Sequence, residues 1–176
     1  MQALIDIVKQ GKALYVGISK YPPAQAKIAY EMLRAAGVPC LISQYRYSMF
    51  DRTVEEKSLP LAAEQGSGFI AFSPLAQGLL TKKYLHGIPE HSRAARSTGF
   101  LKVDQVTEDK VGKARRLDEI AARRGQTLAE MALAWVLKDE RMTSVIVGTS
   151  SVKQLADNLH ACLLYTSPSP RDSTSS

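Results

Sequence analysis

The chain has 176 residues, of which 45% are hydrophobic and 23% are charged, and its formal net charge is +6. This composition is typical of a globular protein with one buried core, and no apolar stretch reaches the roughly 20 residues that a membrane span requires. Residues 1–6 lack the basic and apolar regions of a secretion signal, so we expect a cytoplasmic protein without membrane contact.

The first half of the chain alternates helical segments with short apolar segments. Helices are expected over residues 1–10, from Pro22-Pro23 to about residue 36, and over residues 54–65; strands are expected over residues 13–19 and 40–44. The first strand is rich in β-branched and aromatic residues, and Gly37 ends the helix that follows it. Residues 1–10 have helical spacing without an N-cap, which is typical of the end of a longer element.

The central segment is the apolar run Phe69–Phe72, which stops at Ser73-Pro74 and passes into a turn that contains Gly78. It predicts a third strand, buried on both faces, followed by a polar loop. The remaining predicted elements are an irregular stretch over residues 81–106, helices over 107–124 and 128–138, a strand over 144–148 and a helix from Thr149-Ser150-Ser151 to about residue 159. Thr127 and Glu130 have the spacing of a capping box.

Continuous apolar strands that alternate with helices indicate an α/β protein with a parallel sheet, because parallel strands need crossovers and are buried on both sides. The expected strands end in small or polar residues, at Ser19-Lys20, Ser43-Gln44, Ser73 and Gly148-Thr149-Ser150. Carboxyl ends of parallel strands lie at one edge of the sheet. We therefore expect the binding face at that edge.

The C-terminal residues differ in composition from the rest of the chain. From Tyr165 on, the sequence is rich in serine, threonine and proline without apolar periodicity, which predicts disorder. Residues 163–172 also resemble translated sequencing-adapter read-through. We therefore expect one domain over residues 1–161 and a non-native or disordered tail over residues 162–176.

Familiar catalytic patterns are missing from the sequence. It contains no Walker loop, no G-x-G-x-x-G fingerprint, no zinc-ligand spacing and no nucleophile elbow, and its two cysteines make neither a disulfide framework nor a metal site. His86, His91 and His160 show no partner for acid/base work, and Tyr45-Arg46-Tyr47 is better explained as a half-buried loop aromatic. Scattered lysines and arginines favour solvated helix faces over a nucleic-acid surface.

One segment has the chemistry of an anion site. Gly148-Thr149-Ser150-Ser151 opens a helix, where free backbone N–H groups and the helix dipole attract anions, and Lys153 lies in the first turn. The same residues would also serve as an ordinary N-cap. From these residues alone both interpretations stay open.

Four segments together resemble the second half of an aldo-keto reductase: Leu14–Ser19, Ile42–Tyr45, Phe72–Tyr84 and Val147–Asn158. The most similar subgroup holds bacterial glyceraldehyde 3-phosphate reductases and potassium-channel β subunits. The resemblance implies an α/β fold that is the C-terminal half, strands five to eight with their helices, of a (β/α)8 TIM barrel. It also implies an oxidoreductase that uses NADPH/NADP+ to reduce aldehydes or ketones by hydride transfer.

The resemblance further implies a set of cofactor-binding residues. Ser19 and Gln44 would bind the nicotinamide carboxamide and Phe72 would stack on its ring; Ser73, Leu75, Gln77, Gly78 and Lys83 would lie along the pyrophosphate; Arg93 would close over the cofactor; Ser150 and Gln154 would meet the 2′-phosphate, and Asp157 and Asn158 the adenine. Lys20 is a further expected cofactor position, at which many relatives have Asn. The preference for NADPH over NADH rests on Ser150 and Lys153.

The family's catalytic Asp, Tyr, Lys and His come from strands one to four, and no such strands precede Met1. We therefore expect a fragment that holds no catalytic residue and is inactive alone. Four strands of an eight-stranded barrel leave two open edges, which predicts poor solubility or self-association. A homo-oligomer in which two copies complete a barrel is compatible with the sequence.

Two other functions stay open at this point. A cofactor-binding regulatory subunit like the potassium-channel β subunits would share this half, and a flavodoxin-like domain would share the strand order but not the Phe72–Tyr84 motif. The expected partner is a small-molecule carbonyl substrate, which Arg93, Arg96 and Lys102 could favour in phosphorylated form.

Overall fold

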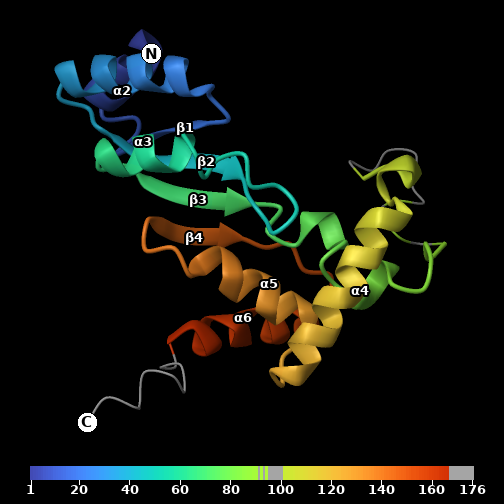
Figure 1. The fold of residues 1–176 in the computed structure, drawn as a ribbon. Coiled ribbons are helices and arrows are strands. Elements are labelled where there is room, and N and C mark those ends of the chain that lie inside the picture. The colour runs from blue at the N-terminus through green and yellow to red at the C-terminus, as the bar shows by residue number, and fades with distance from the viewer. Residues whose placement is uncertain (91, 93, 95–100, 167–176) are drawn as a thin grey trace.

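The computed structural model describes residues 1–90, 92, 94 and 101–166 (Figure 1). The helices are α1 (Gln2–Lys9), α2 (Pro23–Ala35), α3 (Ser58–Glu64), α4 (Glu108–Arg123), α5 (Leu128–Leu137) and α6 (Val152–Thr166), and the strands are β1 (Val16–Ser19), β2 (Cys40–Arg46), β3 (Gly68–Phe72) and β4 (Met142–Ile146). Short 3-10 helices lie at Ala76–Gly78 (η1), Lys82–Tyr84 (η2) and Val103–Gln105 (η3).

The four strands form one parallel sheet in the order β1-β2-β3-β4. At the carboxyl ends, Ser19 is paired with Gln44, and Phe72 is paired with Arg46 on one side and Ile146 on the other. The predicted α/β class and parallel sheet are therefore confirmed, and all four carboxyl ends lie at one edge. Each strand neighbours the next one along the chain, as in a segment of a (β/α)8 barrel.

Several element boundaries differ from the predicted ones. β1 begins at Val16 rather than residue 13, and Leu14 and Tyr15 before it are 82% and 68% exposed. β2 continues to Arg46, β4 covers residues 142–146 rather than 144–148, and α3 begins at Ser58 rather than 54. Strand boundaries depend on pairing with the neighbouring strand, and helix boundaries depend on packing, so local composition does not fix either one.

α6 also ends later than predicted, at Thr166 rather than near residue 159. Its middle is held against α5, because His160 Nδ1 lies 2.8 Å from Glu130 Oε1 and Ala161 is fully buried. Glu130 is thus a structural partner of His160, a contact that the sequence did not indicate. Residues 167–176 of the predicted tail lie outside the described residues, and the domain boundary at residue 161 stays a prediction.

Only one face of the sheet is well covered, which corrects the expectation that the third strand is buried on both faces. In β3, Phe69 and Ala71 are fully buried, whereas Ile70 and Phe72, on the opposite face, are only half-buried. The Phe69 ring stacks on Tyr45 with a centroid distance of 5.1 Å. Figure 1 shows α1 and α2 beyond β1 and α5 and α6 beyond β4. The buried face of β3 packs against α3 and α5, as the outer face of a barrel strand packs against its helices.

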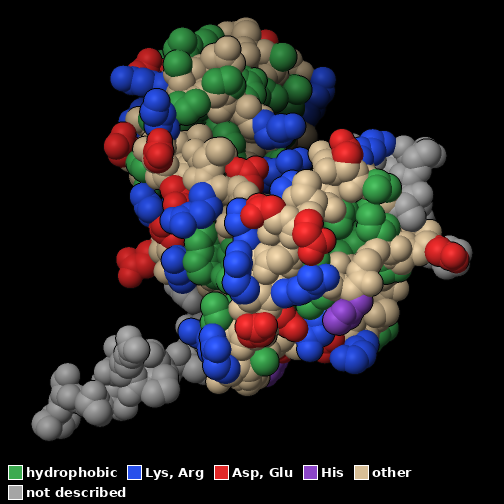
Figure 2. Space-filling model, turned by 45° about the vertical axis from the view of Figure 1, so that its right-hand side comes forward, with side chains coloured by type: hydrophobic (Ala, Val, Ile, Leu, Met, Phe, Trp, Pro, Cys, Tyr) green, Lys and Arg blue, Asp and Glu red, His purple; other side chains and the backbone are tan. Residues whose placement is uncertain are grey.

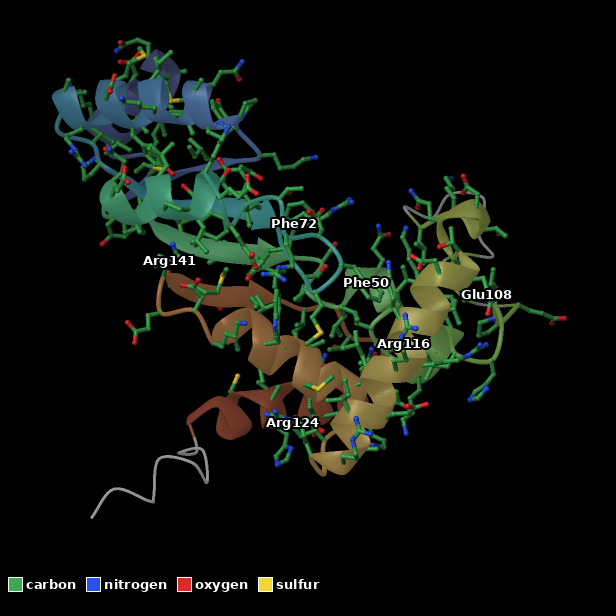
Figure 3. The ribbon with its side chains drawn as sticks, viewed as in Figure 1. Phe50, Phe72, Glu108, Arg116, Arg124 and Arg141 are labelled. Atoms are coloured by element: carbon green, nitrogen blue, oxygen red, sulfur yellow. The ribbon has the colours of Figure 1, made fainter. Side chains whose placement is uncertain are left out.

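The irregular stretch after β3 is anchored by its own apolar cluster. Leu80, Leu85 and Leu128 are buried there between the 3-10 helices, α4 and α5, and Arg115 Nε donates to Leu85 O at 2.9 Å. Figure 3 shows Phe72 at the tip of β3 and Phe50 between that tip and α4. α4 is therefore held beside the carboxyl edge of the sheet.

The charged side chains are scattered over the surface, as the sequence predicted. Figure 2 shows basic and acidic side chains interspersed over the face in view. Among the described residues, no helix has both the length and the apolar character needed to cross a bilayer.

The predicted capping box at the start of α5 is confirmed. Thr127 Oγ1 accepts from Glu130 N at 3.2 Å, and Glu130 Oε2 accepts from Thr127 N at 2.7 Å. Burial by itself would raise the pKa of Glu130, but the hydrogen bonds from Thr127 and His160 outweigh it and the pKa lies below its ordinary value. The ionised carboxylate thus joins the start of α5 to α6.

Replacing Glu130 with alanine should therefore lower the free energy of unfolding by about 1 kcal/mol at neutral pH. A lowered folded pKa adds stability above the ordinary value of 4.5, and this stability is lost as pH falls through the lowered pKa. The difference between wild type and Glu130→Ala in urea unfolding should shrink accordingly on acidification. Glu119→Ala, an exposed glutamate on α4, is the control, and an equal loss in both variants would contradict the role of the cap.

Candidate functional site

A cavity of about 510 Å³ opens at the carboxyl edge of the sheet, between the loop after β3 and the start of α6. We call it the α6 cavity; it is lined by Ser73, Pro74, Leu75, Gln77, Gly78, Thr81, Lys83, Ile146, Val147, Gly148, Thr149, Ser150 and Gln154. Seven of the predicted cofactor-binding residues are in this set. The two segments that carry them are about 70 residues apart in the chain, and the pairing of β3 with β4 brings them together.

The loop after β3 has an unusual backbone. Ser73, Ala76 and Gln77 have φ values of 54°, 47° and 60°, in the left-handed region that costs free energy for residues other than glycine. Gly78 has φ 102°, and a Cβ there would lie 3.2 Å from the Tyr84 ring. Ala76 N donates to Ser73 O and Gly78 N to Leu75 O, both at 2.9 Å. The tight turn places the Ser73 and Gln77 side chains on the cavity wall.

Polar groups at the start of α6 are partly bonded to one another. Ser150 N and Oγ donate to Gln154 Oε1 at 2.9 and 3.1 Å, and Gln154 N donates to Ser151 Oγ at 3.2 Å. Lys153 forms an ion pair with Asp157 at 2.9 Å and does not line the cavity. The positive side chain of the α6 cavity is therefore Lys83, not Lys153.

Four predicted residues lie at the carboxyl ends of β1, β2 and β3 but do not line the α6 cavity. Ser19 and Gln44 are register partners, and Lys20 N donates to Gln44 O at 3.0 Å with Lys20 at φ 61°. Phe72 is half-buried, and the Arg46 guanidinium lies 5.9 Å from its ring centroid. These residues form one continuous edge that leads toward the cavity.

The structure does not bring the predicted adenine residues into the α6 cavity. Asp157 is engaged by Lys153, and Asn158 is 5% exposed and lines a different cavity beside Leu133 and Val145. Asn158 Nδ2 has no hydrogen-bond acceptor among the described residues. Asn158 lies about one turn beyond Gln154 on α6, where it lines the same cavity as Leu133 of α5 and Val145 of β4. Arg93 lies outside the described residues, as do His91 and Arg96.

Tyr45 and Tyr47 have structural roles, although they are buried rather than half-buried as expected. Tyr45 Oη donates to Tyr21 O and Tyr47 Oη to Glu55 Oε1, both at 2.8 Å. Burial raises the pKa of Tyr45 to about 12, and burial together with Glu55 raises that of Tyr47 further. Neither hydroxyl is placed for proton transfer at the carboxyl edge.

Comparison with known proteins decides the family. A sequence model described as the Aldo/keto reductase family matches residues 1–169. The chain belongs to the aldo/keto reductase family. Two relatives named L-glyceraldehyde 3-phosphate reductase, from Escherichia coli O157:H7 and Escherichia coli (strain K12), are 47% and 45% identical to it over 163 residues. Each alignment covers 90% of this chain and 47% of the relative, so the chain spans about half the length of these relatives.

The sequence analysis did not include one residue that lies at the carboxyl edge of the sheet. Arg46 was grouped with its tyrosine neighbours as a loop, but β2 continues through it, and its side chain lies on the same face as Gln44. The period of two along a strand would have placed Arg46 beside Gln44, had the strand been extended by two residues. The proximity of its guanidinium to the Phe72 ring depends on the pairing of β2 with β3, which local sequence pattern does not encode.

Proposed function

We propose that the chain is part of an NADPH-dependent reductase that converts aldehydes or ketones to alcohols, and that this part binds the cofactor. The observation that carries the proposal is the meeting in the α6 cavity of seven residues that the family resemblance had implied. Family membership supports an oxidoreductase, and the parallel sheet fits strands five to eight of a (β/α)8 barrel. The names of the two relatives favour a small phosphorylated aldehyde as substrate.

The chemistry of the cavity wall fits the phosphate groups of a dinucleotide. Lys83 supplies positive charge and Ser73 supplies a hydroxyl. The Ser150 and Thr81 hydroxyls already donate, to Gln154 Oε1 at 3.1 Å and to Gly78 O at 2.7 Å. The left-handed backbone at Gln77 and Gly78 would leave room for the phosphate groups to approach the main chain closely. When bound, NADPH supplies the hydride for carbonyl reduction.

The other predicted residues have positioning roles in this proposal. Phe72 offers an aromatic face at the end of β3, and Gln44 and Ser19, one and two strands away, offer hydrogen-bonding groups to a carboxamide. Fixing the plane of the bound ring decides which of its faces is turned toward a substrate. Proton donation to the carbonyl oxygen is assigned to residues outside this chain, and we expect no turnover by the chain alone.

Replacing Lys83 with methionine should weaken NADPH binding by about five- to ten-fold, because one charged contact to phosphate is lost. Binding is measured by titrating the chain with NADPH and following nucleotide fluorescence. The matched control is Lys82→Met, since Lys82 is the preceding residue and pairs with Asp118 at 3.9 Å. Equal affinities for wild type and Lys83→Met, or no NADPH binding by the wild type, would overturn the proposed function.

A further inference from the structure

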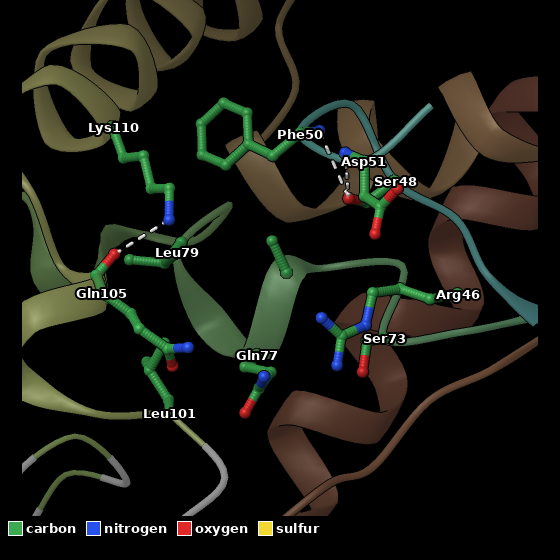
Figure 4. A pocket seen from close by; sticks show the side chains of 11 residues that line it. Arg46, Ser48, Phe50, Asp51, Ser73, Gln77, Leu79, Leu101, Gln105 and Lys110 are labelled. Atoms are coloured by element: carbon green, nitrogen blue, oxygen red, sulfur yellow. Dashed lines mark hydrogen bonds between the residues drawn. The ribbon is translucent and has the colours of Figure 1, made fainter. Parts of the chain in front are cut away.

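A second cavity, of about 220 Å³, lies on the other side of the loop after β3 (Figure 4). We call it the β2 cavity; it is lined by Arg46, Ser48, Phe50, Asp51, Ser73, Ala76, Gln77, Leu79, Leu101, Gln105 and Lys110. Ser73 and Gln77 also line the α6 cavity, so the strained turn is the common wall of the two. A ligand in the β2 cavity would therefore lie next to the proposed cofactor.

Arg46 is the first of two positive side chains in the β2 cavity. It ends β2, and its guanidinium is held near the Phe72 ring; Figure 4 shows the guanidinium beside the Ser73 side chain. Among the described residues, no carboxylate forms an ion pair with Arg46. A guanidinium next to an aromatic face keeps its in-plane N–H donors free for a second ligand.

Lys110 is the second positive side chain, and it comes from α4 on the opposite wall (Figure 4). Its Nζ donates to Gln105 O at 3.2 Å, which leaves two further N–H groups. The one acid of the lining, Asp51, accepts from Thr53 Oγ1 at 2.8 Å and Thr53 N at 3.4 Å within its own turn. The cavity thus has two basic side chains on facing walls, and its single carboxylate is already engaged.

The uncharged part of the lining suits a small molecule with a short carbon chain. Leu79 and Leu101 are buried on one wall, and Ser48 Oγ on another accepts from Phe50 N and Asp51 N, both at 3.2 Å. The volume is less than half that of the α6 cavity and is too small for a nucleotide. Two cations on facing walls match a doubly charged group such as a phosphate monoester.

We propose that the β2 cavity binds the phosphate of a small phosphorylated carbonyl substrate, and that Arg46 and Lys110 determine this specificity. The inference rests on the proposed function, since it assigns the substrate side of the same site. Arg46 would bind two phosphate oxygens through its planar fork, and Lys110 would add a point charge from α4. The shared Ser73 and Gln77 would hold the carbon chain beside the cofactor.

The test titrates the chain with glycerol 3-phosphate, a substrate-like compound that cannot be reduced, and measures heat of binding. Wild type should bind glycerol 3-phosphate at least ten-fold more tightly than glycerol or glycerate. Arg46→Met and Lys110→Met should each weaken binding by about ten-fold, and Arg46→Lys should restore part of the loss. Lys83→Met, which changes only the α6 cavity, should leave this affinity within about two-fold.

The outcomes separate this inference from the proposed function. Unchanged affinity in Arg46→Met and Lys110→Met would overturn the inference, as would the absence of binding by wild type. Glycerate binding as tight as glycerol 3-phosphate would overturn the assignment to phosphate. If the chain bound glycerol 3-phosphate through Arg46 but never bound NADPH, the proposed function would fall while the anion site stood. Circular dichroism checks the fold of each variant, and Lys110→Met on the surface of α4 carries the test if Arg46→Met unfolds.

Discussion

Replacing Phe69 with alanine is expected to lower the free energy of unfolding by about 3–5 kcal/mol. The Phe69 side chain is 0% exposed, stacks on Tyr45 and belongs to the core cluster that joins β3 to α3 and α5. The lost transfer free energy and the remaining cavity act together, and the total stability of a domain is only about 5–15 kcal/mol. Urea unfolding followed by circular dichroism measures the loss.

Phe72 is the matched control, because it lies on the same strand three residues later and faces the other side of the sheet. It is half-buried, and Phe72→Ala should cost much less stability, about 1 kcal/mol. The same variant should weaken NADPH binding if Phe72 stacks on the bound ring. Equal destabilisation by the two variants would show that both faces of the sheet are packed alike.

The second large effect is expected in the association of the chain. A parallel sheet is normally covered on both faces, but here one face is half-open and β1 and β4 have unpaired edges among the described residues. Leu41, on β2, is 50% exposed, and Tyr15 lies beside the edge of β1. We expect sedimentation velocity to show concentration-dependent oligomers rather than one monomeric species.

Charged substitutions on this surface should reverse the association. Leu41→Lys combined with Tyr15→Lys should shift the chain toward monomer, because each ammonium would be desolvated in an apolar contact. Val103→Lys is the control: Val103 is 58% exposed on η3, away from the sheet, and its replacement should change nothing. A monomeric wild type with a sharp two-state melt would contradict the prediction.

Local sequence patterns account for much of the fold. The capping box at Thr127 and Glu130, the helix that begins after Pro22 and the parallel order of four apolar strands are each confirmed. These features depend on residues within about one turn or one strand of each other, or on the rule that parallel strands need crossovers. Motif resemblance added the family, which comparison with known proteins confirms.

The sequence by itself therefore determined the family, the parallel sheet and the segments that line the α6 cavity. Only the tertiary structure decided that the sheet is covered on one face, that Asn158 faces a separate cavity, and that Lys110 lies opposite Arg46. The direction of a side chain toward a distant segment depends on how whole helices pack. α6 is held on α5 through His160 and Glu130, and α4 is held on the loop after β3 through Arg115. Such contacts join residues about 30 positions apart, which the spacing of residues within one element does not encode.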